Sequence, residues 1–335
     1  MARGSLFTTI TMRNTGPQDR RCSYVVHVQS ATASASELRE LATYFSSLGV
    51  AGCDVVILDS SPRLQFELNA RILRWVGRHV AVRSEYRAPG GVDLVRAAIS
   101  YAACEKVIIA NEDVRYTTEA IAQLCELLEM HEVVEPQDYL DPMPWWSGID
   151  AGRMLIHRGI EPQPDHGATF GFRRSAIRGL RGLPSSPDAH ARRLIAVGAE
   201  VHSASDVFVR REPAPLSEWM TSRPRLAGDD FTLPFKTAFF FSLVPVLLLL
   251  AAMGGPRFAG VYASVIAFAA VGLAARGRAG TAAMHFPLRA CLFAPLWVLE
   301  RSMSVYWALF NKLRGADEDV SRLPAPAEAR ERQVM

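Results

Sequence analysis

Apolar and polar positions follow one another along the first half of the chain in a pattern that predicts strands and helices in alternation. Apolar runs typical of strands buried in a sheet are expected at 24–28, 55–58, 80–83 and 107–110. Stretches with a helical period lie between them, at 34–48, at 64–76 and after 90–91. This alternation predicts an α/β domain with a parallel sheet, in outline a nucleotide-binding half-domain.

Polar residues stand directly after two of these expected strands. The run VIIA continues into Asn111, Glu112 and Asp113. The run VVIL continues into Asp59 and Ser60. Carboxyl ends of parallel strands meet at one edge of a sheet, and ligands of open α/β sheets bind at that edge. Oxygen ligands there suit Mg2+ or Mn2+, a cation that is typically shared with the phosphates of a nucleotide.

Each of these acidic positions also has a plainer interpretation. Asp113 is able to cap the helix that Thr117 and Thr118 open, and Asp59 suits a turn before Pro62. The segment RAPGGVDLVRAA, which contains Arg96, opens a helix with a glycine pair and would present backbone N–H groups to a phosphate. Neither GxGxxG nor a P-loop motif is present, which argues against a dinucleotide enzyme and a P-loop ATPase.

Two long apolar segments follow the α/β part of the chain, at 237–254 and 258–275. Each has about 18 residues without charge, enough to cross a bilayer core of about 30 Å. The short GGPR link makes them a hairpin, and Lys236, Arg276 and Arg278 place both outer ends in the cytoplasm. A buried hairpin of a soluble protein is the alternative, but neither segment has a polar face.

A third apolar stretch, at 286–310, differs because Pro287 and Pro295 interrupt it and Glu300 and Arg301 lie inside it. Charges are costly at the middle of a membrane, so we expect an interfacial or re-entrant pair of helices at 286–312 on the cytoplasmic side. Aromatic residues expected at the level of the lipid headgroups are Trp297, Tyr306 and Trp307.

Composition sets the remaining limits. The chain has 335 residues and a net charge of +3, and it has no dense basic stretch with interleaved aromatics, which argues against nucleic acid as a partner. Five scattered cysteines without a CxxC pair indicate reduced thiols. We expect a flexible N-terminus at 1–22 without a secretory signal, an α/β domain at 23–230, a membrane region at 233–312 and a disordered tail at 315–335. The protein is thus predicted to be a multi-pass cell (inner) membrane protein whose α/β domain is cytoplasmic.

The segments VVILDSSP, GGVDLVRAA and VIIANEDVRYTTEAI, in this order, resemble the nucleotide-sugar-binding half of the family 2 glycosyltransferases of the GT-A fold. VEPQDYLDPMPWW, HGATFGFRRSAI and RPRLAGDDFTLPF resemble that family's acceptor-side loop, the following strand and a basic segment before the membrane. The resemblance covers about 24–236. It implies a Rossmann-like GT-A domain and an inverting, metal-dependent glycosyltransferase of the hexosyltransferase type that uses a nucleotide-sugar donor.

The resemblance also implies roles for individual residues. Asp59 would hold the nucleoside, and Asp113 would hold the metal that bridges the diphosphate. Arg223 and Arg225 match a basic motif that helps hold the diphosphate. Further residues expected to bind the nucleotide sugar are Ser60, Arg96, Asn111 and Glu112. Asn111, a candidate metal ligand, stands where the family has its first aspartate.

An inverting transfer needs a base that takes the proton of the acceptor hydroxyl. In the family the catalytic acids precede a helix that here reads SSPDAHARRLIAVG, so Asp188 is the candidate, with capping of the helix at 189–197 as its plainer role. Asp138 and Asp141 are alternatives. Side chains expected at the acceptor are Trp145, Trp146 and His166. Packing or membrane anchoring remains open for the two tryptophans and a structural role for the histidine.

The adjacent membrane hairpin predicts a lipid or lipid-linked acceptor. Two other classes of function remain open. One is a non-catalytic glycosyltransferase-like protein that binds a nucleotide or a partner at the membrane. The other is a membrane-anchored nucleotidyltransferase, which would need a Gly-rich basic loop after its first strand. The segment QSATASASELRE has no glycine and no lysine there, which argues against it.

Overall fold

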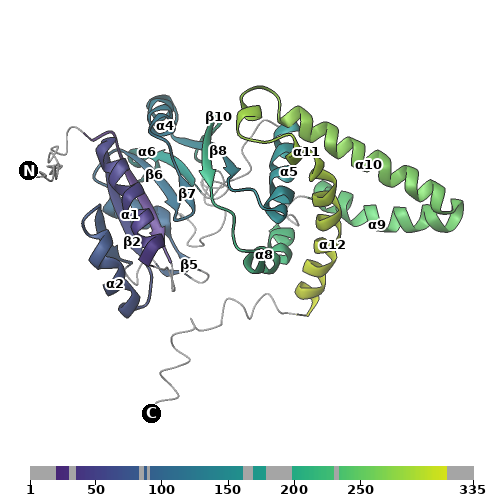
Figure 1. Ribbon diagram of the computed structural model, residues 1–335, viewed down its shortest axis with the longest axis horizontal. Helices are drawn as coiled ribbons and strands as arrows, with labels where there is room; N and C mark the ends of the chain where they lie inside the picture. Colours follow the sequence, from purple (N-terminus) through teal and green to yellow (C-terminus); the bar gives the residue numbers. More distant parts are fainter. Residues whose placement is uncertain are drawn as a thin grey trace, which may run out of the picture.

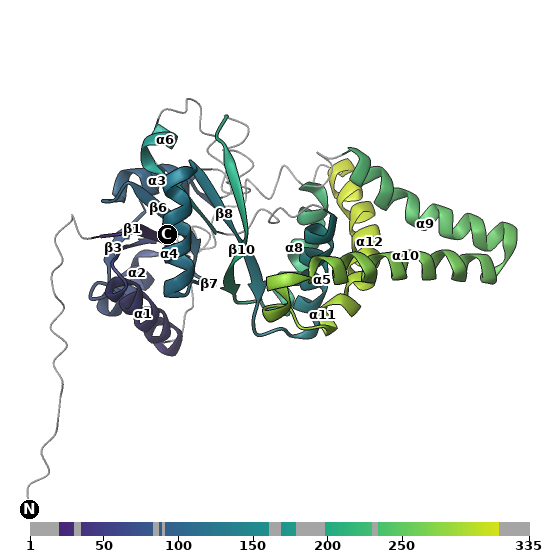
Figure 2. The same cartoon turned by 90° about the horizontal axis from the view of Figure 1, so that it is seen from above.

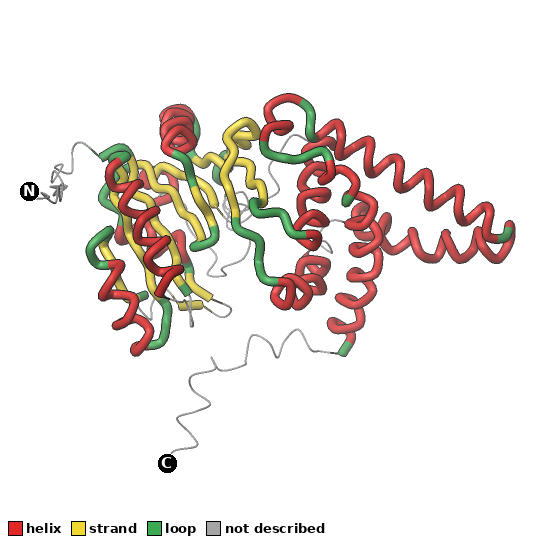
Figure 3. The backbone as a smooth tube through the Cα atoms, in the orientation of Figure 1, coloured by secondary structure: helices red, strands yellow, loops and turns green. Residues whose placement is uncertain are grey.

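The computed structural model describes residues 20–29, 35–82, 87–88, 91–160, 169–178, 198–229 and 234–314. Within these ranges the chain forms a mixed sheet with helices on both faces and, beside it, a layer of helices from which two long helices project (Figure 1). The predicted α/β class with a C-terminal apolar hairpin is therefore confirmed. Figure 3 shows the division plainly, with the strands gathered on one side and the second group of helices on the other.

The first half of the sheet is parallel, as the sequence predicts. Its strand order is β3 (Arg78–Ala81), β2 (Cys53–Asp59), β1 (Cys22–Val28) and β6 (Lys106–Asn111). The connecting helices are α1 (Ala35–Val50), α2 (Arg63–Leu73) and α3 (Leu94–Tyr101), and a small hairpin of β4 (Arg87–Ala88) and β5 (Gly91–Val92) precedes α3. The third strand begins two residues earlier than the expected 80–83, because Arg78 and His79 pair with Val56 and Ile57 of β2.

The second half of the sheet is mixed. Its strands are β9 (Thr169–Arg173), β8 (Val133–Leu140), β10 (Val201–Arg211) and the short β7 (Val114–Arg115). β9 is antiparallel to both β6 and β8, and β10 is parallel to β8. It follows that β1, β2, β3, β6, β8 and β10 all run in one direction. Their carboxyl ends therefore lie along a single edge of the sheet.

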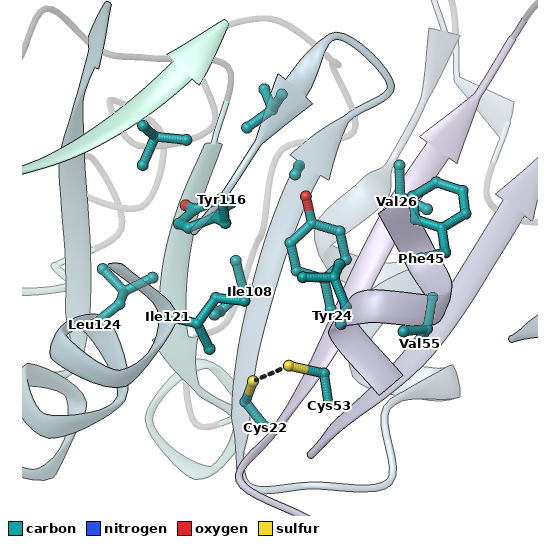
Figure 4. Packing of buried hydrophobic residues seen from close by; sticks show 14 of the residues in the cluster. Cys22, Tyr24, Val26, Phe45, Cys53, Val55, Ile108, Tyr116, Ile121 and Leu124 are labelled. Atoms are coloured by element: carbon teal, nitrogen blue, oxygen red, sulfur yellow. Dashed lines mark hydrogen bonds between the residues drawn. The ribbon is translucent and has the colours of Figure 1, made fainter. Parts of the chain in front are cut away.

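Alternating side chains of the strands build an apolar core on each face of the sheet. Tyr24 and Val26 of β1 belong to the core on the face that α1 and α4 (Thr118–Met130) cover, which also contains Phe45 of α1 and Leu124 of α4 (Figure 4). Val25, on the opposite face of β1, belongs to the core that α3 and α6 (Arg174–Arg178) cover. This two-faced burial explains why the strands of the first half read as continuous apolar runs.

The helix α4 settles one alternative for Asp113. The hydroxyl of Thr117 accepts a hydrogen bond from the backbone N–H of Ala120 at 3.2 Å, so Thr117 is the N-cap. The interpretation of Asp113 as the cap of this helix is wrong. Asp113 lies instead in the turn between β6 and β7, four residues before the cap, where its side chain is free of that structural task.

The helical layer is attached to the carboxyl edge of the sheet. Its helices are α5 (Trp145–Ile160), α8 (Leu216–Asp229), α9 (Pro234–Gly254), α10 (Pro256–Gly277), α11 (Arg289–Leu292) and α12 (Ala294–Leu313), with a 3-10 turn at Gly280–Met284. α5 follows the end of β8, and α8 follows the end of β10. One apolar cluster joins α5 and α8 to the C-terminal helices. The edge that gathers the candidate site residues therefore borders this layer.

The helices α9 and α10 form an antiparallel pair that projects from the rest of the molecule (Figures 1 and 2). The segments Phe235–Gly254 and Pro256–Gly277 have mean hydropathies of 2.2 and 2.0, with 11% of the most apolar window of each buried within the molecule. Both are long and apolar enough to cross a membrane, and they match the predicted segments at 237–254 and 258–275. Most side chains of these two helices are therefore not buried against the rest of the protein.

The expected helix pair at 286–312 is a short α11 followed by the long α12. Arg301, whose charge argued against a full crossing, lies on the inner face of α12 and is 4% exposed. On the outer side α12 presents large apolar side chains, among them Leu299, Met303 and Trp307. The helix is thus amphipathic, but opposite to a surface helix of a water-soluble protein: its charged residue Arg301 faces the protein and its apolar side chains face outward.

The contact between α5 and α10 is unusually close because glycines form it. A Cβ atom added to Gly277 would lie 2.9 Å from the backbone nitrogen of Gly159 and would also meet the carbonyl of Leu155. A Cβ atom on Gly159 would in turn meet the carbonyl of Leu273. The backbones of the two helices therefore touch, and this contact fixes the projecting pair to a helix that begins at the end of the sheet.

Candidate functional site

The sheet register aligns the predicted residues along one edge. Val28 pairs with Asp59, and His27 pairs with Asn111, so the ends of β2 and β6 lie on either side of the end of β1. Asp138 lies near the carboxyl end of β8 on the same edge. The structure therefore brings together, at the level of the strands, three of the positions that the sequence pattern singled out.

Asp59 is held by a closed set of hydrogen bonds and is 1% exposed. Its Oδ1 accepts from the backbone N–H of Ser61 at 2.8 Å, and its Oδ2 accepts from the amide of Asn69 at 2.9 Å. Nε2 of His79 also lies 2.9 Å from Oδ2. Burial raises the pKa of Asp59, but the hydrogen bonds from His79, Ser61 and Asn69 outweigh it and hold the pKa below its ordinary value. Asp59 thus ties the ends of β2, β3 and α2 together while staying ionised.

The neighbours of Asp59 extend this polar group toward the end of β1. The hydroxyl of Ser60 lies 2.9 Å from Nε2 of His27, and its backbone N–H donates to the carbonyl of Val28. Arg96 lies in the first turn of α3 with an exposed side chain, and its backbone N–H donates to Asp93. Ser60 is therefore part of the strand-edge group, whereas Arg96 reaches into solvent from the helix after the glycine pair.

The acidic run after β6 makes its main contact with β10. Nε of Arg211 donates to Oδ2 of Asp113 at 2.6 Å, a short charge-assisted hydrogen bond. Nη1 of Arg211 lies 4.0 Å from Oδ2 of Asp138. Burial lowers the pKa of Arg211, but Asp113 and Asp138 outweigh it and raise the pKa above its ordinary value. A charged guanidinium thus lies between two carboxylates, one from the turn after β6 and one from β8.

The remaining members of this region lie around the same pair. Asn111 ends β6 and is half-buried, and the backbone carbonyl of Glu112 accepts a hydrogen bond from the side chain of Arg115. Asp138 is 4% exposed. Asp141, the second alternative base, is exposed, and its Oδ2 lies 3.9 Å from Nη1 of Arg210.

The side chains at the acidic run do not fit a divalent cation in this arrangement. Oδ2 of Asp113 is taken by Arg211, and Oδ1 is sealed from solvent without a hydrogen bond from any described residue. Asn111 supplies a neutral amide where a carboxylate would be needed to balance a cation. Among the residues that the structure describes, no three His, Cys, Asp or Glu side chains are placed to hold a metal ion. The expectation of Mg2+ or Mn2+ stays a prediction from the sequence.

Arg223 is placed in the helical layer rather than at the strand edge. Its Nη1 donates to Oδ1 of Asp150 at 2.8 Å and its Nη2 to Oδ2 at 3.2 Å, while its Nε donates to the carbonyl of Trp219. The indole N–H of Trp219 donates to the same carboxylate at 2.8 Å. Arg153 lies 3.7 Å from Asp150. Arg225 belongs to α8, and the structure describes its backbone only.

The charges of this cluster act on one another across a nearly dry interior. Burial raises the pKa of Asp150, but Arg153 and Arg223 outweigh it and hold that pKa below its ordinary value. Burial lowers the pKa of Arg153 to about 10, despite Asp150, because Arg301, Arg223 and Arg211 add positive charge around it. These couplings extend from α12 through α5 to the end of β10. The strand edge and the helical layer therefore share one electrostatic environment.

The two tryptophans expected at the acceptor begin α5. Trp145 is 58% exposed and forms edge-on contacts with Trp146 and Trp219. The indole N–H of Trp146 donates to the carbonyl of Ala214 at 3.1 Å, which anchors that ring. The structure thus offers one free aromatic face, that of Trp145, and one fixed ring beside it. His166 and Asp188 lie outside the described residues.

Several residues of this region were not singled out from the sequence. They are His27, His79, Asp150, Arg153 and Arg211. Two of them had a signal, because His27 and Arg211 are polar residues at strand ends, as Asp59 and Asn111 are. Asp150 and Arg153 lie inside the amphipathic pattern of α5, where nothing in the sequence separates a buried ion pair from a solvated helix face.

No known protein family matches the sequence, and no curated protein is similar to it at a significant level. A search of solved structures finds similar chains. One is a mannosyltransferase from Pyrobaculum calidifontis in complex with GDP-Man and Mn2+, with 18% identity, a TM-score of 0.46 and coverage of 87% of this chain and 88% of the other. Another is glucosyl-3-phosphoglycerate synthase from Mycobacterium tuberculosis in complex with Mn2+, UDP and glucosyl-3-phosphoglycerate, with 15% identity, a TM-score of 0.40 and coverage of 61% and 77%.

Proposed function

We propose that this chain is a membrane-anchored inverting glycosyltransferase that moves a sugar from a nucleotide-sugar donor to a lipid or lipid-linked acceptor. The observation that carries the proposal is the position of the polar strand edge. The helices α5 and α8 follow strands that end at the same edge as Asp59, Asn111 and Asp113, and both pack against the C-terminal helices, which include the two long apolar ones. A donor bound at this edge would face the membrane side of the protein.

The donor side of the proposal rests on the sheet. In α/β sheets, nucleotides bind beyond the carboxyl ends of parallel strands, and here six strands present those ends together. Ser60 and His27 form a polar pair near one end of the edge, where we place the nucleoside, and Asp59, whose oxygens are already hydrogen-bonded, fixes the end of β2 beside them. Arg211 and Asp113 lie farther along the edge, where we place the diphosphate.

The acceptor side of the proposal rests on the helical layer. Two helices have the length and hydropathy of membrane spans. The outer side of α12 exposes Leu299, Met303 and Trp307, and that of α11 exposes Leu292. A surface of this kind suits the boundary between headgroups and acyl chains. Lys236, Arg276 and Arg278 at the outer ends of the hairpin favour the cytoplasmic side for the α/β domain.

For the chemical step, a base must take the proton of the acceptor hydroxyl as the sugar bond to the diphosphate breaks. We assign this role to Asp188 and keep Asp138, which lies at the strand edge beside Arg211, as the alternative. Trp145 would hold the acceptor through its exposed ring.

The test is transfer by the purified protein in lipid vesicles, with a panel of radiolabelled nucleotide sugars and membrane-lipid extracts as acceptors. Asp188→Asn should leave nucleotide-sugar binding intact and reduce transfer at least about 100-fold, the lower end of general-base catalysis. Asp206→Asn, at an exposed partner of Arg158, is the matched control and should transfer at the native rate. Native transfer by Asp188→Asn would move the role to Asp138. Absence of transfer by the native protein with every donor would favour the non-catalytic alternative.

Topology is tested separately with reporter fusions. A fusion after Gly255 should report the outside, and fusions after Arg278 and Met335 should report the cytoplasm. A C-terminus on the outside would contradict the interfacial placement of α11 and α12, because it would require a third crossing.

A further inference from the structure

Any group that binds the diphosphate of a nucleotide sugar has to meet its negative charge with positive charge. The sequence predicts a divalent cation for that purpose, held by the acidic run after β6. The structure places a cation of the protein itself at this run. Arg211 binds the carboxylate that the metal was expected to bind, and its second nitrogen lies 4.0 Å from a second carboxylate, that of Asp138.

The backbone of Arg211 is fixed on both sides, so its position does not depend on the side-chain contact alone. Arg211 pairs with Val114 of β7 and with Leu140 of β8 in the sheet. Its carbonyl accepts from the backbone N–H of Asp141 at 3.1 Å, and the next residue, Glu212, donates to the carbonyl of Asp113 at 2.8 Å. Backbone hydrogen bonds therefore connect the end of β10 to the turn that contains Asp113.

The guanidinium has capacity left for a ligand. Only Nε donates a hydrogen bond within the described residues, to Asp113, and the side chain is 34% exposed. The two Nη groups carry four further N–H donors, in the fork geometry that matches phosphate oxygens. Arg211 therefore uses Nε for Asp113, while Nη1 has an ion-pair contact of 4.0 Å with Asp138 and Nη2 has no hydrogen bond within the described residues, which leaves donors for an incoming anion.

The guanidinium of Arg211 lies between two carboxylates, and further arginines lie beyond them. Asp113 and Asp138 are its nearest anions, and Arg153 lies close enough to sense its charge. Arg153 belongs in turn to the group of Arg223 and Arg301 around Asp150. Within the described residues, this connected set thus has four arginines and three aspartates. Arginines therefore lie beyond the two carboxylates, and they add positive charge to the region where a diphosphate would bind Arg211.

We propose that Arg211 is the resident cation of the donor site, which binds the diphosphate of the nucleotide sugar through its Nη groups in place of a divalent metal ion. Asp113 is then a positioning residue that orients the guanidinium through Nε. This inference rests on the proposed function, because it assigns a role within the donor site. It also explains the neutral Asn111 at the strand end, since a site that holds a guanidinium needs one carboxylate less than a site that holds a divalent ion.

The experiment measures binding of UDP and GDP to the purified full-length protein by calorimetry, once with a chelator and once with Mn2+. The native protein should bind its preferred nucleoside diphosphate with the same affinity in both. Arg211→Met should weaken binding in chelator by about 10- to 100-fold, which corresponds to the loss of charge-assisted hydrogen bonds worth 1.5–3 kcal/mol. Arg211→Lys keeps the charge without the fork and should lose less than Arg211→Met.

Two controls separate this role from a structural one. Arg210→Met removes the preceding arginine, which contacts Asp141 and Glu212, and should bind the nucleoside diphosphate as the native protein does. Electron paramagnetic resonance of Mn2+ reports free and bound ion directly, without any activity. Arg211→Met, which leaves Asp113 and Asp138 without their guanidinium, should bind Mn2+ more tightly than the native protein.

Two results would overturn the proposal: native binding that is lost in chelator and restored by Mn2+, or unchanged affinity of Arg211→Met in chelator. If Arg211→Met does not fold, Arg211→Lys and the metal dependence of the native protein decide the question. Failure of the native protein to bind UDP, GDP or any nucleotide sugar with or without Mn2+ would remove the proposed function itself. That outcome is distinct from metal-dependent binding, which removes the role of Arg211 alone.

Discussion

The sheet and the helical layer differ in where their charged side chains lie. In β2 and β6 the interior of the strand is apolar and polar residues stand at or just after the end, where Asp59 and Asp113 border the carboxyl edge. In the helical layer, Asp150, Arg223 and Arg301 lie inside an apolar cluster of side chains. At this edge, Arg211 links Asp113 of the turn after β6 to the end of β10. Charges inside a helical layer hold helices in one relative position, and removing one partner leaves the others buried.

The layer also packs by a different rule. The sheet faces are filled with Leu, Ile, Val and Phe, whereas α5 and α10 meet through Gly159 and Gly277 with their backbones in contact. Close contact of small residues is the usual way in which helices associate where lipid removes the hydrophobic driving force between them. The comparison indicates that α5, although it begins at the end of a strand, is packed as part of the helical layer.

The largest effect should come from the buried ion pair of the layer. Asp150→Ala leaves Arg223 and Arg153 without their shared carboxylate, and removing one partner of a buried pair typically costs about 3–5 kcal/mol. We expect a large decrease in the thermal unfolding midpoint of the purified protein. The matched control is Asp206→Ala, which removes an exposed carboxylate that pairs with Arg158 at 3.4 Å and for which we expect less than about 1 kcal/mol. Equal shifts for both variants would show that the layer does not depend on Asp150.

The second effect concerns the glycine contact. Gly277→Val places a side chain against the backbone of α5, and backbone on both sides cannot move away as a flexible side chain would. We expect a cost of about 3 kcal/mol, at the upper end of overpacking. Gly272→Val in the same helix is the control, because a Cβ there meets nothing within 4 Å. If thermal unfolding is the same for both variants, α10 does not dock on α5 as described.

The sequence predicted the sheet better than the layer, for a physical reason. Local apolar runs in the sequence mark the strands of the parallel half and the two span-length helices. Their predicted positions therefore agree with the structure within a few residues. The contacts of the layer and of the site join distant positions. Arg211 and Asp113 are 98 residues apart, and Arg223 and Asp150 are 73 apart. No periodicity encodes such a partner, so Arg223 was assigned to a diphosphate by its motif and Arg211 was not singled out.

The third effect tests the polar group at the strand edge. Asp59→Asn keeps the shape of the side chain but turns an amide toward donors from Ser61, Asn69 and His79, and leaving such groups unsatisfied typically costs about 1–3 kcal/mol. The pKa of Asp59 is lowered by folding, so its ionised form stabilises the native state above the ordinary carboxyl pKa of 3.8. This contribution is lost as the pH falls through the lower native pKa.

The measurement for Asp59 is the pH dependence of unfolding below pH 4. Stability of the native protein should decrease as the pH falls, and Asp59→Asn should decrease less steeply because it lacks this titrating group. Asp150 adds a contribution of the same sign in both proteins, since its pKa is also lowered. Identical pH profiles would mean that Asp59 is not the ionised centre of the strand edge.

The smallest effect on stability should occur where the two regions meet, at Trp145. Its ring is largely exposed, so Trp145→Ala should change the free energy of unfolding by no more than about 0.5 kcal/mol. Trp146→Ala breaks a hydrogen bond to Ala214 and should cost more. If Trp145 holds the acceptor, Trp145→Ala should lower transfer to lipid about 3- to 10-fold, the equivalent of one aromatic contact of 0.5–1.5 kcal/mol, and leave nucleotide-sugar binding unchanged. Loss of binding to lipid vesicles together with unchanged transfer to a short, water-soluble acceptor would instead make this ring a membrane anchor.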